Sequence, residues 1–173
     1  MDRIIEQPVG GAYSVHIGRG LLSHPDLIAG MVSGRQVFLV SNETVGPLYA
    51  ATLEATLGSF ETFRYQLPDG EEFKNLEQFS ILLDQFVESG VHRDATIISL
   101  GGGVVSDIAG FAAACYQRGI AHLICPTTLL AQVDAAVGGK TAINHPGGKN
   151  LVGAFHQPVG VVADIATLDT LDD

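Results

Sequence analysis

The amino-acid sequence predicts an α/β fold, a doubly wound parallel sheet with helices on both of its faces. Three observations predict it. Short apolar runs alternate with segments whose apolar residues recur at helical spacing, a run of three glycines joins one apolar run to a helical segment, and polar motifs follow several apolar runs. In such sheets ligands bind outside the carboxyl ends of the strands, so these polar motifs mark the expected site.

Six short runs are apolar or alternate between apolar and polar residues, which is typical of strands. Turn-forming residues stand near the ends of three of them, at Gly18, at Ser41 and at Pro68-Asp69-Gly70. In chain order, the strands are expected at 13–17, 37–40, 60–67, 96–100, 121–125 and 159–163.

Between these runs, apolar residues recur every three or four positions, which predicts helices. In the clearest helix, which begins at Asn75 and runs to Ser89-Gly90, six apolar side chains share one face. The segments around Lys140 and Lys149 are too rich in glycine and proline for ordinary helix. The expected helices are 21–32, 45–57 with Gly58 as a C-terminal stop, 75–89 and 104–115.

Composition favours one globular α/β domain over residues 1–173. The chain is 46% hydrophobic and 16% charged, which is enough for one substantial core. No apolar run reaches the ~18 residues that a membrane span needs. Because the net charge is −10, binding to nucleic acid or to an anionic membrane is not expected. The N-terminus has neither the basic start nor the apolar region of a signal peptide, which indicates the cytoplasm.

The few basic and cysteine residues indicate which kinds of ligand the chain is expected to bind. Four of the nine Lys and Arg residues fall in the motif-bearing segments, which favours an anionic ligand. Cys115 and Cys125 lie in apolar surroundings and are expected to be reduced core thiols. The sequence contains no CxxC or HExxH metal pattern, and no metal ligand is assigned. The four basic residues are Lys74, Arg118, Lys140 and Lys149.

The segment Leu100-Gly101-Gly102-Gly103-Val104-Val105-Ser106-Asp107 has the features of a phosphate cradle. Glycines let the backbone approach an anion closely, and the free N–H groups and dipole of the following helix favour negative charge. A nucleotide is the expected ligand. The loop is neither a GxGxxG fingerprint nor a GxxxxGK[ST] P-loop, so a structural turn without a ligand stays an alternative on this segment alone.

Several further motifs follow the loop in a distinctive order. Together with the loop and with Pro68-Asp69-Gly70-Glu71 and Lys74, they resemble the 3-dehydroquinate synthase family. The resemblance covers nearly the whole chain but only the family's N-terminal half. The motifs are Pro126-Thr127-Thr128-Leu129-Leu130-Ala131-Gln132-Val133-Asp134, Gly138-Gly139-Lys140-Thr141, Asn144-His145 and Gly148-Lys149-Asn150.

The resemblance implies a Rossmann-like domain of an NAD-dependent lyase of the shikimate pathway, which leads to chorismate and the aromatic amino acids. Such enzymes convert 3-deoxy-D-arabino-heptulosonate 7-phosphate, a sugar phosphate, into 3-dehydroquinate and phosphate. The family's catalytic zinc (or cobalt) is held by a helical C-terminal domain that this chain lacks, so we expect the chain alone to be inactive or nearly so. A homodimer is implied for the full-length enzyme.

The resemblance also implies roles for individual residues. Lys140, Asn150 and Asp134 look like catalytic substrate ligands, and Arg118 is expected to reach the substrate phosphate in a partner subunit. A solvated arginine at a helix end is the alternative for Arg118. His145 and His156 are given no catalytic role. The expected cofactor-binding residues are Asn42, Asp69, Glu71, Lys74, Gly102, Gly103, Val104, Ser106, Asp107, Thr127, Thr128, Lys140, Lys149, Thr167 and Thr170.

Two of these assignments leave alternatives open. Asp107 is expected to anchor the loop or contact the nicotinamide ribose, or else to interact only with the helix dipole. Ser106 stands where the family usually has glycine. If the position needs a positive φ, NAD binding suffers, whereas at a helical φ serine is tolerated.

Other functions share part of this pattern. Metal-dependent glycerol and alcohol dehydrogenases, and the sugar-phosphate cyclases that make aminocyclitols, also have a glycine loop and a Thr-Thr segment. The stretch from Lys140-Thr141 to Lys149-Asn150 fits the cyclases better. A non-catalytic NAD-binding module is the alternative from another class, and the high apolar content argues against it.

Overall fold

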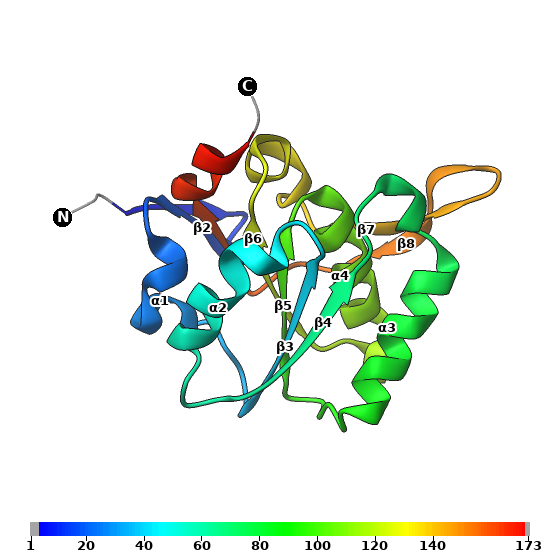
Figure 1. Ribbon diagram of the computed structural model, residues 1–173, viewed down its shortest axis with the longest axis horizontal. Helices are drawn as coiled ribbons and strands as arrows, with labels where there is room; N and C mark the ends of the chain where they lie inside the picture. Colours follow the sequence, from blue (N-terminus) through cyan, green and yellow to red (C-terminus); the bar gives the residue numbers. More distant parts are fainter. Residues whose placement is uncertain (1–3, 172–173) are drawn as a thin grey trace.

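Seven strands form one sheet in the computed structural model, which describes residues 4–171 (Figure 1). The strand order is β1-β2-β9-β6-β5-β3-β4, and every neighbouring pair is parallel except β1 with β2. Strands β3, β5 and β9 are buried along their whole length, which is consistent with their mostly apolar central residues. The strands are β1 (Ile5–Val9), β2 (Tyr13–Gly18), β3 (Gln36–Asn42), β4 (Glu61–Leu67), β5 (Thr96–Gly101), β6 (Ala121–Pro126) and β9 (Gly160–Asp164).

All six predicted strands are confirmed, and β1 is the strand of this sheet that the sequence analysis missed. Its residues are mostly exposed and include Pro8, so neither apolar alternation nor strand propensity marks them. The strand pairs antiparallel with β2 at the edge of the sheet. The predicted doubly wound parallel sheet is therefore present, with one antiparallel strand added.

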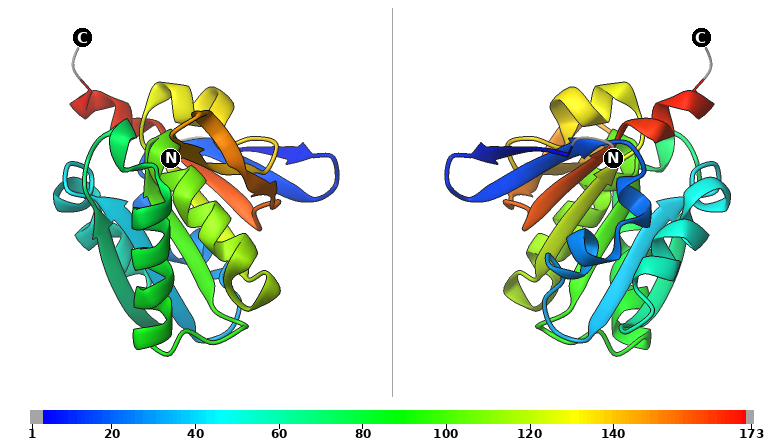
Figure 2. Two further views of the ribbon diagram at one scale, coloured as in Figure 1. Left: turned by 90° about the vertical axis from the view of Figure 1, so that its right-hand side faces the viewer. Right: turned by 90° about the vertical axis from the view of Figure 1, so that its left-hand side faces the viewer.

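Helices cover both faces of the sheet (Figure 2). Helices α3 and α4 pack on one face around Phe38, Phe86 and Ile108, and α1 and α2 pack on the other around Ile28, Leu53 and neighbouring buried residues. On the first face, the rings of Phe38 and Phe86 meet edge to face, with centroids 4.7 Å apart. The helices are α1 (Pro25–Ala29), α2 (Gly46–Thr56), α3 (Leu76–Glu88) and α4 (Gly103–Cys115).

Three of the four predicted helices are confirmed, and the continuous helix predicted over 21–32 is wrong. The segment forms a 3₁₀ turn, η1 (Leu21–Ser23), and the short helix α1. His24 between them is extended, with φ −103° and ψ 92°, because a residue before proline avoids the helical conformation. Pro25 then occupies the first turn of α1, where its missing N–H costs nothing.

A β-hairpin that the sequence analysis did not predict packs against α4. Strands β7 (Lys140–His145) and β8 (Gly148–Phe155) pair antiparallel, and Ile143 of β7 is buried in the same core as α4. Gly153 is required here, because a Cβ would collide with the carbonyl oxygen of Thr141 on the opposite strand. The many glycines that argued against helix belong to this hairpin.

The segments that follow the parallel strands gather at the carboxyl edge of the sheet, at the top of Figure 1. These segments include η2 (Glu71–Phe73), the π-helical turn η4 (Ala131–Ala135) and η5 (Ile165–Thr170). The 3₁₀ segment η3 (Tyr116–Arg118) follows the C-terminal end of α4, away from this edge of the sheet. Within residues 4–171, no helix is long and apolar enough to cross a membrane.

Candidate functional site

A cavity of about 280 Å³ opens at the carboxyl edge of the sheet, where the polar motifs were expected to meet. Residues from the ends of four strands line it, together with Tyr49 of α2 and the end of η5. The predicted cofactor residues that line this cavity are Asn42, Asp69, Gly102, Gly103, Val104, Thr127, Thr128 and Thr170.

The floor of this first cavity is the N-terminus of α4. Gly102 precedes the helix in an extended conformation, with φ −78° and ψ −171°, and no side chain caps the helix there. The hydroxyl of Thr127 is buried and has no hydrogen-bond partner within the described part of the chain. Uncapped N–H groups, a helix dipole and a free hydroxyl form a polar cradle that fits an anion such as a pyrophosphate.

Ser106 lies in the first turns of α4 with a helical backbone, which decides between the two outcomes left open for it. Its φ is not positive, so serine is tolerated without backbone strain. The side chain is buried, and its hydroxyl donates to the carbonyl oxygen of Gly103 at 3.1 Å. The hydroxyl is therefore committed to the helix itself.

Asp69 stands at the rim of the cavity with both carboxylate oxygens held. One accepts from the Asn42 amide at 2.6 Å, and the other accepts from the Thr44 hydroxyl at 2.7 Å. The amide oxygen of Asn42 in turn accepts from the backbone N–H of Val45 at 2.8 Å, just before α2 begins. This chain of bonds fixes an acceptor that suits ribose hydroxyls.

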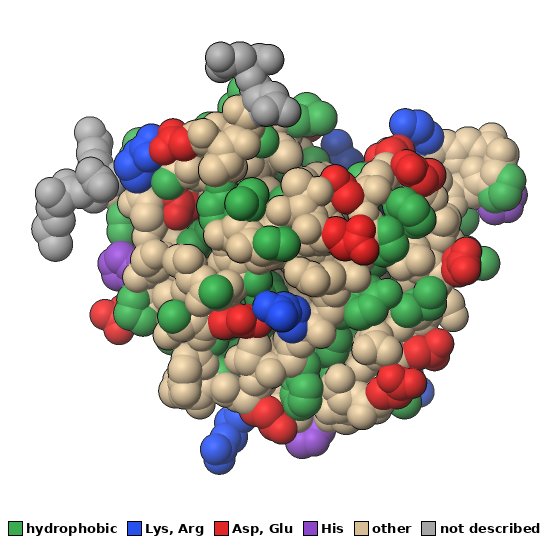
Figure 3. Space-filling model, viewed as in Figure 1, with side chains coloured by type: hydrophobic (Ala, Val, Ile, Leu, Met, Phe, Trp, Pro, Cys, Tyr) green, Lys and Arg blue, Asp and Glu red, His purple; other side chains and the backbone are tan. Residues whose placement is uncertain are grey.

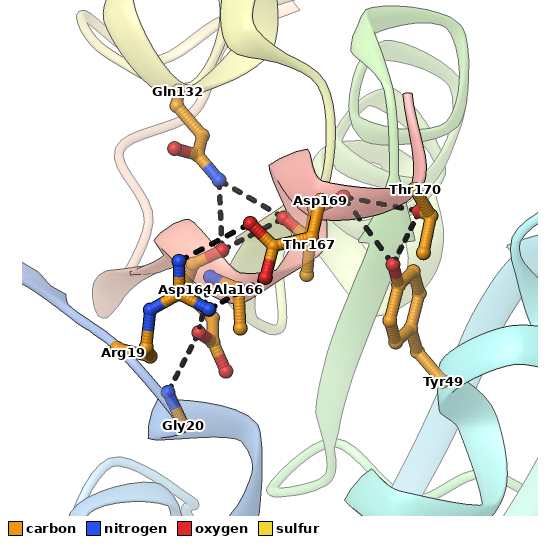
Figure 4. Close-up of polar contacts among 9 residues, drawn as sticks. All are labelled: Arg19, Gly20, Tyr49, Gln132, Asp164, Ala166, Thr167, Asp169 and Thr170. Atoms are coloured by element: carbon orange, nitrogen blue, oxygen red, sulfur yellow. Dashed lines mark hydrogen bonds and ion pairs between the residues drawn. The ribbon is translucent and has the colours of Figure 1, made fainter. Parts of the chain in front are cut away.

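The opposite wall of the cavity is η5, which is held by Gln132, by Tyr49 and by an exposed ion pair between Arg19 and Asp169 (Figure 4). Gln132 donates from its amide nitrogen to the carbonyl oxygens of Pro126 and Asp164, at 3.2 and 3.1 Å, and to the Thr167 hydroxyl at 3.1 Å. Tyr49 reaches η5 from α2, and its hydroxyl lies 2.5 Å from that of Thr170. Thr167 is buried, so it holds the wall while Thr170 faces the cavity.

A second cavity, of about 470 Å³, lies between α4, η4 and the β7–β8 hairpin. Lys140, Asp134 and Asn150, three of the four residues predicted to bind the substrate, line it, and Asp107 does as well. The two cavities are neighbours, because a Cβ at Gly103 in the first would lie 3.4 Å from the Cβ of Ala135, which lines the second.

Lys74 and Asp107 form an ion pair at the wall of the second cavity. The Lys74 ammonium is buried, and it also donates to the side-chain oxygen of Asn150 at 2.7 Å. Burial raises the pKa of the Asp107 carboxyl, and the neighbouring ammonium opposes that rise. Asp107 thus has a specific partner beyond the helix dipole.

Glu71 lies in the same cluster, away from Asp69. Its carboxylate accepts from the Asn144 amide at 2.8 Å, and the Lys149 ammonium is 3.6 Å away. The Asn144 hydrogen bond has the largest effect on the pKa of Glu71 and lowers it; burial opposes this, and Lys74 and Lys149 lower the pKa further. The structure therefore separates Asp69, in the first cavity, from Glu71 and Lys74, which the sequence analysis had grouped together.

Arg118 lies apart from both cavities. It follows the C-terminal end of α4, with φ 70°, whereas both cavities adjoin the N-terminal part of that helix. A helix of 13 residues separates the two ends by roughly 20 Å. Arg118 lines a third, wide hollow of about 680 Å³ with Arg93 and His156. Its predicted role in a partner subunit stays a prediction.

Four residues of the site were missed by the sequence analysis: Thr44, Tyr49, Gln132 and Asn144. Gln132 and Asn144 lie inside motifs that the sequence analysis singled out, so their position in those motifs was an available signal. Thr44 and Tyr49 reach the cavity only because α2 follows β3 closely, and no sequence pattern marked them. No group of three or more His, Cys, Asp and Glu side chains that could hold a metal ion occurs in residues 4–171.

Comparisons with known proteins agree on one family. The family model described as 3-dehydroquinate synthase N-terminal matches residues 64–173. The 3-dehydroquinate synthase of Pseudomonas entomophila (strain L48) is 53% identical over 160 residues, which are 92% of this chain and 44% of that protein. That of Coxiella burnetii (strain RSA 331 / Henzerling II) is 53% identical over 161 residues, or 93% and 45% of the two chains.

Solved structures show the same domain in related cyclases. A 2-deoxy-scyllo-inosose synthase in complex with carbaglucose-6-phosphate, NAD⁺ and Co²⁺ superimposes with a TM-score of 0.89 at 27% identity, covering 98% of this chain and 47% of that chain. The 2-epi-5-epi-valiolone synthase of Streptomyces hygroscopicus subsp. jinggangensis, with NAD⁺ and Zn²⁺ bound, gives 0.82 at 30% identity over 97% and 47%. The chain spans less than half the length of the relatives that it matches. By its matched family model, this chain belongs to the 3-dehydroquinate synthase family and corresponds to its N-terminal region.

Proposed function

We propose that this chain binds NAD⁺ in the first cavity and the sugar phosphate 3-deoxy-D-arabino-heptulosonate 7-phosphate in the second, as the nucleotide-binding part of a lyase that forms 3-dehydroquinate. Membership of the family and about 53% identity to curated 3-dehydroquinate synthases support this activity above that of the other cyclases and of the dehydrogenases. The homodimer implied for the full-length enzyme belongs to the same proposal.

The observation that carries the proposal is the uncapped N-terminus of α4 beside the unpartnered hydroxyl of Thr127. A pyrophosphate lying over Gly102 and Gly103 would accept from the helix N–H groups and from Thr127. Asp69, already fixed by Asn42 and Thr44, offers an acceptor for ribose hydroxyls at the other end of the cavity. These residues fit a dinucleotide.

When bound, NAD⁺ supplies a temporary acceptor for a hydride from the substrate. The residues of the second cavity then act on the substrate itself. Lys140 is exposed and offers a cation to its phosphate, and Asp134 and Asn150 offer acceptors and a donor to its hydroxyls. The Lys74–Asp107 pair lies at the wall of the second cavity, and Lys74 orients Asn150. The described residues contain no cluster suited to zinc or cobalt, so no step is assigned to a metal here.

A glycine-to-valine substitution tests the cofactor site. Gly102 has an extended backbone that any residue can adopt, so Gly102→Val places a branched side chain over the helix N-terminus without backbone strain. A Cβ there would also lie only 3.3 Å from the Thr128 methyl group. We expect isothermal titration to show saturable NAD⁺ binding by the wild-type chain and at least tenfold weaker binding by the variant.

Gly58→Val is the matched control. Gly58 is exposed, follows the end of α2 and lies outside both cavities. The Gly58→Val variant should bind NAD⁺ as the wild type does. If Gly102→Val binds NAD⁺ as tightly as the wild type, the N-terminus of α4 is not part of the binding site. A folded wild-type chain that binds no NAD⁺ would contradict the proposal itself. Release of phosphate from the heptulosonate phosphate by this chain alone would overturn the expectation that it is inactive.

A further inference from the structure

Asn144 joins three parts of the second cavity's wall that are distant in sequence. Its backbone N–H donates to the carbonyl oxygen of Lys74 at 2.7 Å, and its side-chain amide donates to the Glu71 carboxylate at 2.8 Å. Its side-chain oxygen accepts from the backbone N–H of Asn150 at 2.9 Å. The residue lies on β7 where the pairing with β8 is interrupted, between Ile143 and His145.

The last of these bonds holds Asn150 in an unusual conformation. Asn150 has φ 57°, in the left-handed region, which carries a conformational cost for a residue other than glycine, although a smaller one for asparagine than for most. It is also exposed, so packing contributes little to keeping it there. The bond from its N–H to Asn144 is the contact that compensates for this cost. In this conformation the Asn150 side chain reaches back to the buried Lys74 ammonium.

We propose that Asn144 is the positioning residue of the substrate cavity. By accepting the N–H of Asn150 it holds that residue in the left-handed conformation, in which its amide meets Lys74 and faces the cavity. The inference rests on the proposed function for the identity of the ligand, but the positioning itself requires none. Asn144 acts through Asn150 and Lys74 and lies outside the residues that line the cavity.

The two ends of the Asn144 side chain can be separated by substitution. Asn144→Asp keeps an oxygen that accepts from Asn150 but replaces the group that donates to Glu71 by a second oxygen. Asn144→Ala removes both ends. A general loss of stability would affect both variants alike. A positioning role predicts instead that the backbone conformation of Asn150 differs between the two variants, while the pKa of Glu71 changes in the same direction in both.

Nuclear magnetic resonance of the ligand-free chain measures both ends. In Asn144→Ala, the backbone chemical shifts and the HN–Hα coupling of Asn150 should lose their left-handed values, and the Lys74 ammonium resonance should shift. In Asn144→Asp, Asn150 should keep the left-handed values. In both variants the pKa of Glu71 should rise from its lowered value, since its strongest hydrogen bond is lost while Lys74 and Lys149 stay near.

His24→Ala serves as a control, because it removes the cap of α1 far from both cavities. It should leave the resonances of Asn150, Lys74 and Glu71 unchanged. Left-handed values of Asn150 that persist in Asn144→Ala, or that disappear in Asn144→Asp, would overturn the proposal. Because these readouts need no ligand, failure of the wild type to bind NAD⁺ would count against the proposed function and not against this inference.

Discussion

At the scale of single residues, the backbone conformation decides which positions of the glycine loop can accept a side chain. Ser106 is helical, so the chain carries a serine there without strain. Gly102 could also accept a side chain by its φ, but that side chain would occupy the cradle. A side chain at 102 would therefore take space in the proposed cofactor site, whereas the serine at 106 is accommodated by a hydrogen bond within the helix.

His122 is a buried residue that no part of the proposed function uses. It lies on β6 beneath α4, and one ring nitrogen is 2.9 Å from the Ser99 hydroxyl, while the other has no partner in the described chain. Burial lowers its pKa from 6.5 to about 3, so the ring is neutral in the folded protein.

We expect this histidine to make the fold sensitive to mild acid. Between pH 6.5 and 3 the unfolded chain binds a proton at His122 that the folded chain does not, so stability falls as the pH falls. One such group contributes up to about 1.4 kcal/mol per pH unit. Urea unfolding at pH 7 and pH 5 should show this loss in the wild type and a smaller loss in the double variant His122→Leu/Ser99→Ala. Equal losses in the two proteins would assign the acid sensitivity to other groups.

At the scale of elements, the site depends on two segments without regular α or β structure. The π-helical turn η4 and the 3₁₀ segment η5 are held together by Gln132, whose amide donates to Asp164 and Thr167 (Figure 4) and also to the carbonyl oxygen of Pro126 at the end of β6. Because both segments are short, their own hydrogen bonds are too few to fix their orientation. Gln132, Tyr49 and the ion pair of Arg19 with Asp169 hold η5 beside the first cavity.

Removing the Gln132 amide should loosen η5 specifically. Gln132→Met leaves the Pro126 and Asp164 carbonyl oxygens without this donor, so we expect a loss of about 1–2 kcal/mol in the free energy of unfolding. Hydrogen exchange of residues 165–170 should accelerate, and NAD⁺ should bind more weakly. The control Gln85→Met removes only an exposed bond to Glu88 and should change none of these. Unchanged exchange in Gln132→Met would show that other contacts hold η5.

At the scale of the whole molecule, charge and apolar surface are distributed differently. Basic side chains on the face shown in Figure 3 are isolated among acidic and apolar ones and form no continuous basic surface, in keeping with the net charge of −10. Exposed large apolar side chains are instead concentrated in the segments that border the second cavity. Those exposed by more than half are Leu129, Leu130, Val133, Leu151 and Phe155.

This concentration predicts a dye-binding surface. Scattered apolar residues are normal, whereas grouped ones bind hydrophobic probes. The triple variant Leu130→Gln/Val133→Gln/Phe155→Gln should lower the fluorescence of bound anilinonaphthalene sulfonate at least twofold. Leu76→Gln/Val87→Gln, which changes two equally exposed residues on α3, should lower it little. Equal decreases in the two variants would mean that these segments form no distinct apolar surface.

Much of the architecture could be predicted because it depends on local patterns. The buried strands β3, β5 and β9 each contain a short run of apolar residues, and Asn75 caps α3 by accepting from the Gln78 N–H at 3.0 Å, so their approximate bounds follow from the chain itself. Helix 21–32 failed because Pro25 outweighed the helical spacing around it. Strands β7 and β8 were missed because glycines, which usually break strands, are needed where the hairpin strands approach closely.

The sequence by itself determined the alternation of the buried parallel strands with α2, α3 and α4 and the family to which the motifs point, and it predicted the phosphate cradle, because these depend on residue type and spacing along the chain. Only the tertiary structure decided which motif residues share a cavity. In the folded chain Asp69 lies beside Asn42 and Thr44. Glu71 and Lys74 lie instead beside the β7–β8 hairpin, where they contact Asn144 and Asn150 respectively. The physical reason is that side chains a few residues apart point in different directions once η2 bends the chain, and hydrogen bonds across distant segments then select their partners.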